Sequence, residues 1–262
     1  MRGRFNDKHV LVTGGGRGLG FEIARRFGLE GARLSIFDYD GALLDEARGK
    51  LEQAGLEVNT YLTDVSKRVE VERAVTAAEV MAPIDVLVNN AGVAQETPFL
   101  KIEEEEWRRM LDINLTGAFF VAQAVCRHMA RRRRGAVINM SSKNGLVAEF
   151  GYAHYNASKA GLILLTKTMA VELAHLNIRV NAVCPGYLVT PMSQEIDSPE
   201  FVQDFVERYI PVNRPGNVAD APPMFLFLAS EESAFITGQV FIIDGGQLAG
   251  QKPSAQLLEK AL

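Results

Sequence analysis

The chain has 262 residues, of which 47% are apolar and 23% are charged. This composition is close to that of an average soluble protein and excludes a disordered chain, which lacks the apolar surface needed to offset the entropy of ordering. The 23 glycines follow no collagen-like period. The net charge of −4 argues against a dedicated nucleic-acid binder, because such proteins usually carry a basic excess.

Several further classes are disfavoured by features that the sequence lacks. Cys126 and Cys184 form neither a disulfide framework nor a CxxC pair, and the four histidines show no zinc-ligand spacing, so we expect no metal site. The first residues contain no apolar segment of the kind that a secretory signal needs. No run approaches the roughly 18 uncharged apolar residues of a membrane span. We therefore expect a cytoplasmic protein with no membrane partner.

Short apolar runs alternate with segments of helical periodicity along most of the chain. Strands are predicted at residues 9–13, 33–37, 58–62, 84–88, 136–140, 178–183 and 239–243. Helices are predicted at residues 21–30, 42–53, 66–81, 103–130, 153–175 and 217–229. Two of the runs are apolar on both alternations, which is typical of strands covered by helices on both faces. The pattern predicts a single α/β domain over residues 1–262, with a Rossmann-like, doubly wound parallel sheet of about seven strands and helices on both faces.

Three segments stand apart from this alternation. Residues 185–215 contain five prolines, so we expect a small mobile lobe with a helix or two, whose part at 187–215 would bind the substrate. The tail at 247–262 is predicted to contain a short helix that starts near Ser254. The four arginines at 131–134 are interpreted as a solvated helix end, with a docking patch for an anionic partner as the alternative.

A glycine-rich turn links the first predicted strand to the first predicted helix. It departs from the strict GxGxxG pattern, because Leu19 and Ile23 stand where glycines would be needed. Residues without a Cβ nevertheless let the backbone turn sharply and approach a pyrophosphate, while the helix N-terminus offers free N–H groups. The turn therefore predicts a nucleotide site made by Gly14, Arg17, Gly18, Leu19 and Gly20.

An acid at the end of the second strand bears on the choice of cofactor. Asp38 lies 18 residues after Gly20, where a carboxylate can accept hydrogen bonds from both hydroxyls of an adenosine ribose. It would also repel the 2′-phosphate of NADP. Arg17 favours NADP, because it could reach that phosphate, but Tyr39 rather than a second cation follows Asp38. The sequence predicts NAD, with NADP less favoured.

Tyr155 and Lys159 lie one turn apart on a predicted helix and therefore share a face. A phenol titrates at about pH 10 and is a poor base at neutral pH. A neighbouring ammonium stabilises the phenolate and lowers its pKa, and a cationic nicotinamide ring would lower it further. Because this spacing is common by chance, the pair indicates a general base only in combination with further segments of the chain.

In combination these features resemble the short-chain dehydrogenase/reductase family, over residues 9 to 246. The segments that carry the resemblance are the glycine turn, Asp64-Val65, Asn89-Asn90-Ala91-Gly92, Asn114, Ser142 (13 residues before Tyr155), Pro185-Gly186, Thr190 and Asp244-Gly245-Gly246. The resemblance implies the catalytic residues Asn114, Ser142, Tyr155 and Lys159. It adds the cofactor contacts Asp64, Val65, Asn90, Ala91, Gly92, Tyr155, Lys159, Pro185, Gly186 and Thr190.

The resemblance also implies a role for each catalytic residue. Tyr155 would remove the proton of an alcohol while a hydride passes to the nicotinamide. Lys159 would lower the pKa of Tyr155 and hold the nicotinamide ribose, and Ser142 would position the substrate oxygen. Asn114 would hold a water that connects Lys159 to solvent.

The substrate is predicted from the polarity of the neighbouring positions. The candidates for substrate contact are Ser142, Lys143, Asn144, Glu149, His154, Tyr155 and Tyr187, with Gln95 and Glu96 nearby in sequence. Polar linings favour a sugar, a polyol or a small polar hydroxy compound over a steroid or long acyl chain. The alternatives are a 3-oxoacyl-thioester reductase and a non-catalytic NAD-sensing or scaffold protein. Ala157, Ala160 and Gly161 form a small-residue helix face, for which the resemblance implies a second subunit, so we expect a dimer or tetramer.

Overall fold

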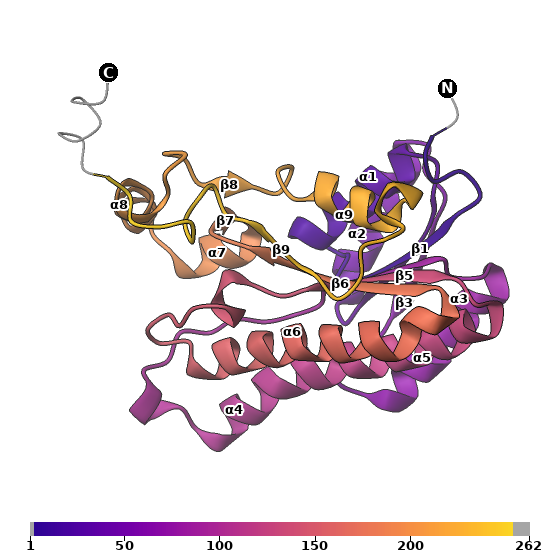
Figure 1. Ribbon diagram of the computed structural model, residues 1–262, viewed down its shortest axis with the longest axis horizontal. Coiled ribbons are helices and arrows are strands. Elements are labelled where there is room, and N and C mark those ends of the chain that lie inside the picture. The colour runs from indigo at the N-terminus through magenta and orange to yellow at the C-terminus, as the bar shows by residue number, and fades with distance from the viewer. Residues whose placement is uncertain (1–2, 254–262) are drawn as a thin grey trace.

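The computed structural model describes residues 3–253 and has a seven-stranded parallel sheet at its centre (Figure 1). The strands are β1 (His9–Thr13), β2 (Arg33–Asp38), β3 (Val58–Leu62), β4 (Val86–Asn89), β5 (Gly135–Met140), β6 (Ile178–Pro185) and β9 (Val240–Ile243). They lie in the order β3-β2-β1-β4-β5-β6-β9 and every neighbouring pair is parallel. The chain reverses its direction of winding between β1 and β4, which confirms the predicted doubly wound fold.

Helices cover both faces of this sheet (Figure 1). One face carries α1 (Gly18–Leu29), α2 (Gly41–Gln53) and α9 (Pro222–Ala229); the other carries α3 (Arg68–Met81), α5 (Ala118–Arg132) and α6 (Ala153–Leu173). Within β1, Val10 and Val12 pack into the first core while Leu11 packs into the second. Successive strand residues point to opposite faces, so two cores explain why the strands are apolar on both alternations.

The helix predicted at 103–130 is interrupted. The structure has α4 (Glu104–Leu111), a π-helical turn, η2 (Asp112–Gly117), and then α5. The amide of Asn114 accounts for the interruption, because it binds the backbone of Val93 rather than pointing to solvent: Oδ1 accepts from the Val93 N–H at 2.8 Å and Nδ2 donates to the Val93 carbonyl at 2.9 Å. π-Turns inside helices often occur at functional sites.

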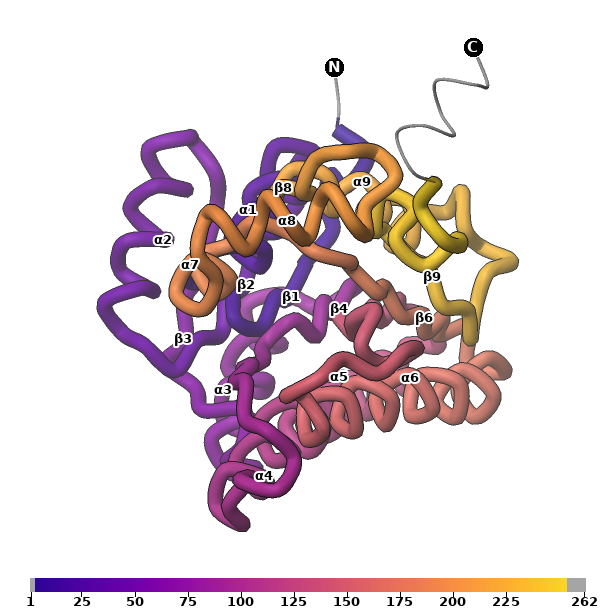
Figure 2. Tube along the Cα trace, turned by 90° about the vertical axis from the view of Figure 1, so that its left-hand side faces the viewer, coloured from indigo at the N-terminus to yellow at the C-terminus, as the bar shows by residue number. Residues whose placement is uncertain are grey.

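The proline-rich lobe contains two short helices, α7 (Pro191–Ile196) and α8 (Pro199–Tyr209). Thr190 and Ser198 cap them through hydroxyl oxygens, and a proline follows each cap at the first helical position, where its missing N–H costs nothing. The lobe is bounded by β7 (Leu188–Val189) and β8 (Gly216–Asn217), which pair in parallel. In Figure 2, α7 and α8 lie on the opposite side of the molecule from α4. The helix predicted near Ser254 lies outside the described residues.

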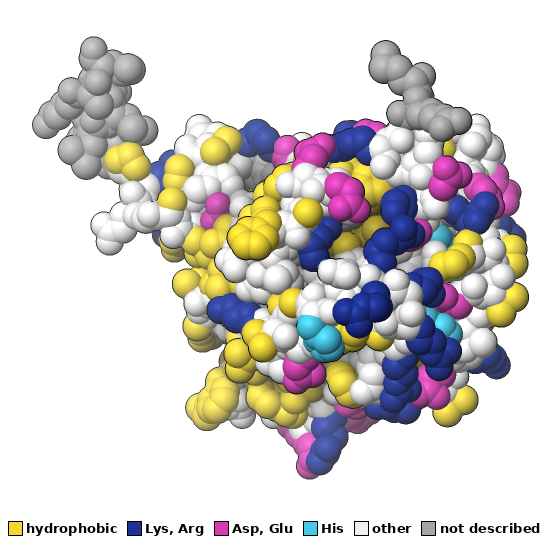
Figure 3. Space-filling model, turned by 45° about the vertical axis from the view of Figure 1, so that its right-hand side comes forward, with side chains coloured by type: hydrophobic (Ala, Val, Ile, Leu, Met, Phe, Trp, Pro, Cys, Tyr) yellow, Lys and Arg dark blue, Asp and Glu magenta, His cyan; other side chains and the backbone are white. Residues whose placement is uncertain are grey.

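The arginines at 131–134 are mostly engaged within the chain. Arg132 pairs with Glu79 at 2.7 Å, Arg133 donates to the His175 carbonyl at 2.7 Å, and Arg134 pairs with Asp85. On the face of the molecule shown in Figure 3, Lys and Arg side chains gather on one part, and Asp and Glu side chains lie among them. The interpretation of this run as a helix end with local partners fits these contacts better than an open cationic patch.

His9 makes the stability of the sheet sensitive to pH. Its ring is 1% exposed and hydrogen-bonds the Ala82 carbonyl through Nδ1 and the Ser35 hydroxyl through Nε2, both at 2.8 Å. Burial lowers the pKa of His9 below its ordinary value of 6.5. The unfolded chain therefore binds this proton more readily, and the free energy of unfolding should fall as the pH drops below about 6.5, by up to about 1.4 kcal/mol per pH unit.

Urea denaturation at pH 7.5 and 5.5 tests this prediction. His9→Gln should be less stable at pH 7.5 but should lose less stability on acidification than the unsubstituted protein. His175→Gln, at an exposed histidine, serves as the control and should keep the original pH dependence. Equal acid sensitivity in the His9 variant and the unsubstituted protein would show that the pH effect arises elsewhere.

Candidate active site

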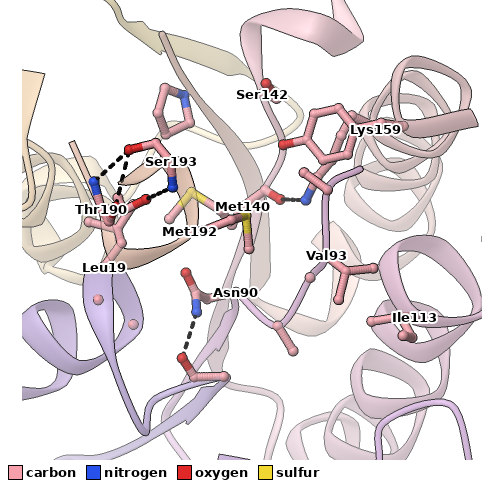
Figure 4. A pocket seen from close by; sticks show the side chains of 18 of the residues that line it. Leu19, Asn90, Val93, Ile113, Met140, Ser142, Lys159, Thr190, Met192 and Ser193 are labelled. Carbon is pink, nitrogen blue, oxygen red and sulfur yellow. Dashed lines mark hydrogen bonds between the residues drawn. The ribbon is translucent and has the colours of Figure 1, made fainter. Parts of the chain in front are cut away.

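A cavity of about 540 Å³ lies at the carboxyl ends of the strands, where the connections after β1 and β4 leave toward opposite faces of the sheet. Open α/β sheets bind their ligands at this position. The cavity is lined by every residue predicted to contact the cofactor, and by Ser142, Lys143, Asn144, Glu149 and Tyr187. Figure 4 shows residues from both sides of it, with Val93 and Ile113 facing Leu19, Thr190 and Met192 across the space.

The glycine turn packs against the end of β4 so closely that side chains are excluded. Gly14 and Gly18 have positive φ angles of 63° and 59°, which favour glycine. A Cβ at Gly20 would collide with the Gly14 carbonyl and the Asn90 amide. That amide donates to the carbonyls of Thr13 at 2.9 Å and Gly14 at 3.0 Å, so it joins the ends of the two central strands.

The start of α1 is suited to a phosphate. The helix begins at Gly18, its N-cap Arg17 makes no side-chain cap, and its first turn contains no acid. The free N–H groups and the positive end of the helix dipole therefore face the cavity without a competing carboxylate. A nicotinamide dinucleotide fits this arrangement, with its pyrophosphate over the glycine turn.

Asp38 and Arg17 lie at the same end of the cavity, but Asp38 accepts from a backbone N–H whereas Arg17 is paired with another side chain. Asp38 is 7% exposed and accepts a hydrogen bond from the Gly16 N–H at 2.9 Å, which holds its carboxylate beside the turn. Arg17 forms an ion pair with Glu195 of α7 at 2.6 Å. This ion pair raises the pKa of Arg17, so the guanidinium stays charged. Its donors already bind the carboxylate of Glu195.

Lys159 and Tyr155 lie together under the other end of the cavity. The Lys159 Nζ donates to the Met140 carbonyl at 2.9 Å (Figure 4) and lies 5.6 Å from the centre of the Tyr155 ring. Burial lowers the pKa of Lys159 to about 8 and raises the pKa of Tyr155, while the Ser142 hydroxyl lowers the latter in part. The shift at Tyr155 is opposite to the one expected from a neighbouring ammonium, because loss of water around the phenol outweighs the hydrogen bond with Ser142.

Ser141 and Ser142 directly follow β5, and their hydroxyl groups point in different directions. The Ser142 hydroxyl faces the cavity and accepts from the Asn144 N–H at 3.1 Å. The Ser141 hydroxyl donates to the backbone carbonyl of Lys159 at 2.8 Å, which fixes α6 against the sheet. The structure thus places Ser142 next to Tyr155, as the 13-residue spacing predicts, and gives Ser141 a separate packing contact.

Asn114 lies behind the cavity wall and not on it. It is fully buried, and a Cβ at Gly92 would lie 3.1 Å from its Oδ1 and 3.4 Å from the Lys159 Nζ. Gly92 therefore separates Asn114 from Lys159 by the width of a bare backbone. This arrangement leaves room for a link between the two, and a side chain at position 92 would close it.

The part of the cavity beyond Tyr155 is polar. Lys143 and Glu149 form an ion pair at 2.7 Å, and the Tyr187 hydroxyl donates to Asp197 at 2.8 Å. Asp197 and burial raise the pKa of Tyr187, so it remains a neutral donor. The polarity expected from the sequence is therefore present, with the charges largely matched in pairs.

Three of the positions weighed for the substrate do not line the cavity. His154 is fully buried and hydrogen-bonds Glu106 of α4 through Nε2 at 2.7 Å, because its helix position turns it away from Tyr155. Gln95 and Glu96 are also absent from the lining, and Glu96 packs against Gly151. Met192 and Asp197 line the cavity from within the lobe expected to bind the substrate, whereas Arg109 and Tyr152 line it without having been predicted. The i, i+4 spacing of Arg109 and Ile113, both on the wall, is the signal that could have located the first of them.

The described residues lack two features, a membrane-spanning helix and a cluster of metal ligands. Over residues 3–253, no helix is long and apolar enough to cross a membrane. Over the same residues, no three His, Cys, Asp or Glu side chains gather as metal ligands would.

Comparison with known proteins gives the same assignment over nearly the whole chain. Residues 14–247 match a family model described as enoyl-(acyl carrier protein) reductase. The chain is 38% identical to a 3-oxoacyl-[acyl-carrier-protein] reductase of Thermotoga maritima, over 93% of this chain and 98% of the relative. It is 36% identical to a 5-keto-D-gluconate 5-reductase of Escherichia coli, over 92% of this chain and 95% of the relative.

A solved structure agrees in shape. It is a gluconate 5-dehydrogenase from Burkholderia cenocepacia in complex with NADP and tartrate; it superposes with a TM-score of 0.90 at 33% identity and covers 95% of this chain and 98% of its own. The shared fold, the glycine turn and the Ser142, Tyr155 and Lys159 cluster identify the chain as a member of the short-chain dehydrogenase/reductase family, an oxidoreductase of CH–OH groups that uses a nicotinamide cofactor.

Proposed function

We propose that this enzyme oxidises the secondary alcohol of a small polar hydroxy compound, such as a sugar or polyol, or reduces the matching ketone, with NAD as the cofactor. The observation that carries the proposal is the polar wall around Ser142 and Tyr155, where Lys143, Glu149, Tyr187 and Asp197 offer hydrogen bonds to hydroxyl groups. These groups are paired with one another, and a substrate hydroxyl can share in their hydrogen bonds whereas a long acyl chain gains none from them.

The cluster divides the chemistry among three side chains. Tyr155 takes up the proton of the substrate hydroxyl, Ser142 holds the oxygen beside it, and Lys159 lies close enough to stabilise the phenolate once the site is closed. The nicotinamide supplies the hydride acceptor. Asn114 lies across the bare backbone of Gly92 from Lys159, where it would hold a water that connects Lys159 to solvent.

Electrostatics at the adenosine end support NAD. The buried carboxylate of Asp38 would repel a 2′-phosphate, and the guanidinium that could offset the repulsion, Arg17, is paired with Glu195. One solved relative holds NADP, so the preference is a property to test in this chain.

The role of Tyr155 predicts the behaviour of Tyr155→Phe. Turnover should fall by at least about 100-fold, because general acid–base catalysis of this kind contributes roughly that much or more. Binding of NADH, followed by fluorescence titration, should stay within about twofold because the phenyl ring preserves the packing. Tyr152→Phe is the matched control, since Tyr152 also lines the cavity. Turnover in Tyr155→Phe equal to that of the unsubstituted enzyme would refute the assignment.

The role of Asp38 predicts a change in cofactor preference. Asp38→Ala should narrow the ratio of kcat/KM for NAD over NADP by about 10-fold or more, because removal of a close like charge is worth at least about 1.4 kcal/mol. Asp45→Ala, at an exposed acid of α2, is the control and should leave the ratio unchanged. A preference for NADP in the unsubstituted enzyme would contradict the Asp38 argument.

The second candidate is a 3-oxoacyl-thioester reductase. The Thermotoga maritima relative favours it. The arginine run at 131–134, which could have docked an acidic carrier protein, argues against it because three of its members have partners within the chain. NADH formation across sugars, polyols, hydroxy acids and 3-hydroxyacyl thioesters separates the candidates. Activity confined to thioesters would replace the proposal, and no activity at all would favour an NAD-sensing or scaffold role.

We also propose that the enzyme forms a homo-oligomer through α6. Ala157, Ala160, Leu164 and Val171 form an exposed stripe on this helix, with Leu164 66% and Val171 83% exposed. Gly161, which we expected on the same face, packs against Leu115 of its own chain. Exposed apolar stripes of this kind mark protein contacts.

Leu164→Glu tests this interface. A charge buried without a partner at the contact should shift the protein to a smaller species in light scattering coupled to gel filtration. Glu172→Lys, at an exposed position on another face of the same helix, is the control and should have less effect. A monomeric unsubstituted protein would refute the proposal.

A further inference from the structure

The cationic side chains of the cavity differ in whether they have a partner. Arg17 pairs with Glu195, Lys143 pairs with Glu149 and Lys159 donates to the Met140 carbonyl. Arg109 also lines the cavity, but it forms neither a hydrogen bond nor an ion pair with any residue in the described part of the chain. Arg109 is exposed to solvent. Within the described residues, Arg109 is therefore the cation of this cavity whose side chain has no partner, so all of its donors are available to a ligand.

We propose that Arg109 binds a carboxylate of the substrate, so that the enzyme prefers a hydroxy acid to the neutral polyol of the same length. The inference rests on the proposed function and narrows its substrate class. A guanidinium presents a planar fork of N–H donors that matches a carboxylate with two parallel hydrogen bonds. A neutral hydroxyl at the same position gains only one weaker bond.

The position of Arg109 relative to Tyr155 is fixed by a buried contact. Glu106 lies one turn before Arg109 on α4, and His154 immediately precedes Tyr155 on α6. The two are joined at 2.7 Å, and His154 is fully buried, so the contact ties α4 to α6 next to both functional side chains. The contact therefore fixes the helix that carries Arg109 against the helix that carries Tyr155, and both side chains line the same cavity. This tether gives His154 a positioning role in place of direct substrate contact.

The opposite wall carries the complementary charge. Asp197 follows α7 in the lobe, and its carboxylate accepts from the Tyr187 hydroxyl. Figures 1 and 2 both place the lobe across the molecule from α4. Arg109 and Asp197 thus contribute opposite charges from opposite sides of one cavity. A hydroxy acid is oriented by this field, with its carboxylate toward α4 and its hydroxyl groups toward the lobe.

Matched substrate pairs test the proposal. We would measure kcat/KM with NAD for gluconate against glucitol, glycerate against glycerol, and 3-hydroxybutyrate against 2-butanol, together with a 3-hydroxyacyl thioester. In the unsubstituted enzyme at least one acid should be preferred to its neutral analogue by about 10- to 100-fold, the range for a charge-assisted pair. Arg109→Gln should remove this preference mainly through KM for the acid, and should leave turnover of the neutral analogue within about twofold. Arg109→Lys should retain part of it.

Arg108→Gln is the matched control. Arg108 is the adjacent residue, has the same charge, pairs with Glu104 at 2.7 Å and does not line the cavity. It should keep the preference for the acid, which separates direct contact from a general change in charge. An equal acid preference in Arg109→Gln and the unsubstituted enzyme, or none in the latter, would overturn the inference while turnover of sugars or polyols leaves the proposed function intact. Turnover of the thioester alone would overturn both.

Discussion

The amide of Asn90 joins the ends of the two central strands, and the cofactor end of the site depends on it. The connections that follow β1 and β4 leave toward opposite faces of the sheet, and the crevice between these connections at the carboxyl ends of the strands is the binding site. Asn90 holds β4 against the glycine turn that leaves β1, through the carbonyls of Thr13 and Gly14. The contact is so close that Gly20 tolerates no side chain. The glycine turn therefore lies close against the end of β4, and the N-terminus of α1 follows directly from this turn. Both features depend on the contact that Asn90 makes.

A second constraint acts where the chemistry is proposed. The same burial shifts the pKa of Tyr155 upward and that of Lys159 downward, so both groups are driven toward their neutral forms. Below a pH of about 8 the lysine still carries its charge, held by the Met140 carbonyl. The positive charge of an oxidised nicotinamide ring would lower the pKa of the phenol and so oppose the effect of burial.

The sequence predicted the fold well because its signals are local and repeated. Apolar runs such as that of β1 alternate between two cores, and this pattern is visible without any contact information. The glycine turn, Ser142, Tyr155 and Lys159 were located for the same reason, because each sits at a spacing set by one strand end or one helix turn. The π-turn at Asn114 was missed because its cause, the backbone of Val93, lies 21 residues away. Arg109 and the His154–Glu106 contact were missed because they depend on how α4 packs against α6, which periodicity within a helix does not encode.

The lobe has a feature whose consequence concerns how such enzymes diversify. Its two ends, β7 and β8, pair side by side in register, so the chain leaves and re-enters the molecule at nearly the same place. Between these ends the lobe is held by two further contacts: Glu195 pairs with Arg17 of the glycine turn, and the Val212 N–H donates to the Gly245 carbonyl after β9. Changes in the lobe that keep both contacts and the paired ends leave the sheet undisturbed. Transplanting the corresponding stretch between relatives that act on thioesters and on sugar acids offers a route to new specificities on an unaltered catalytic frame.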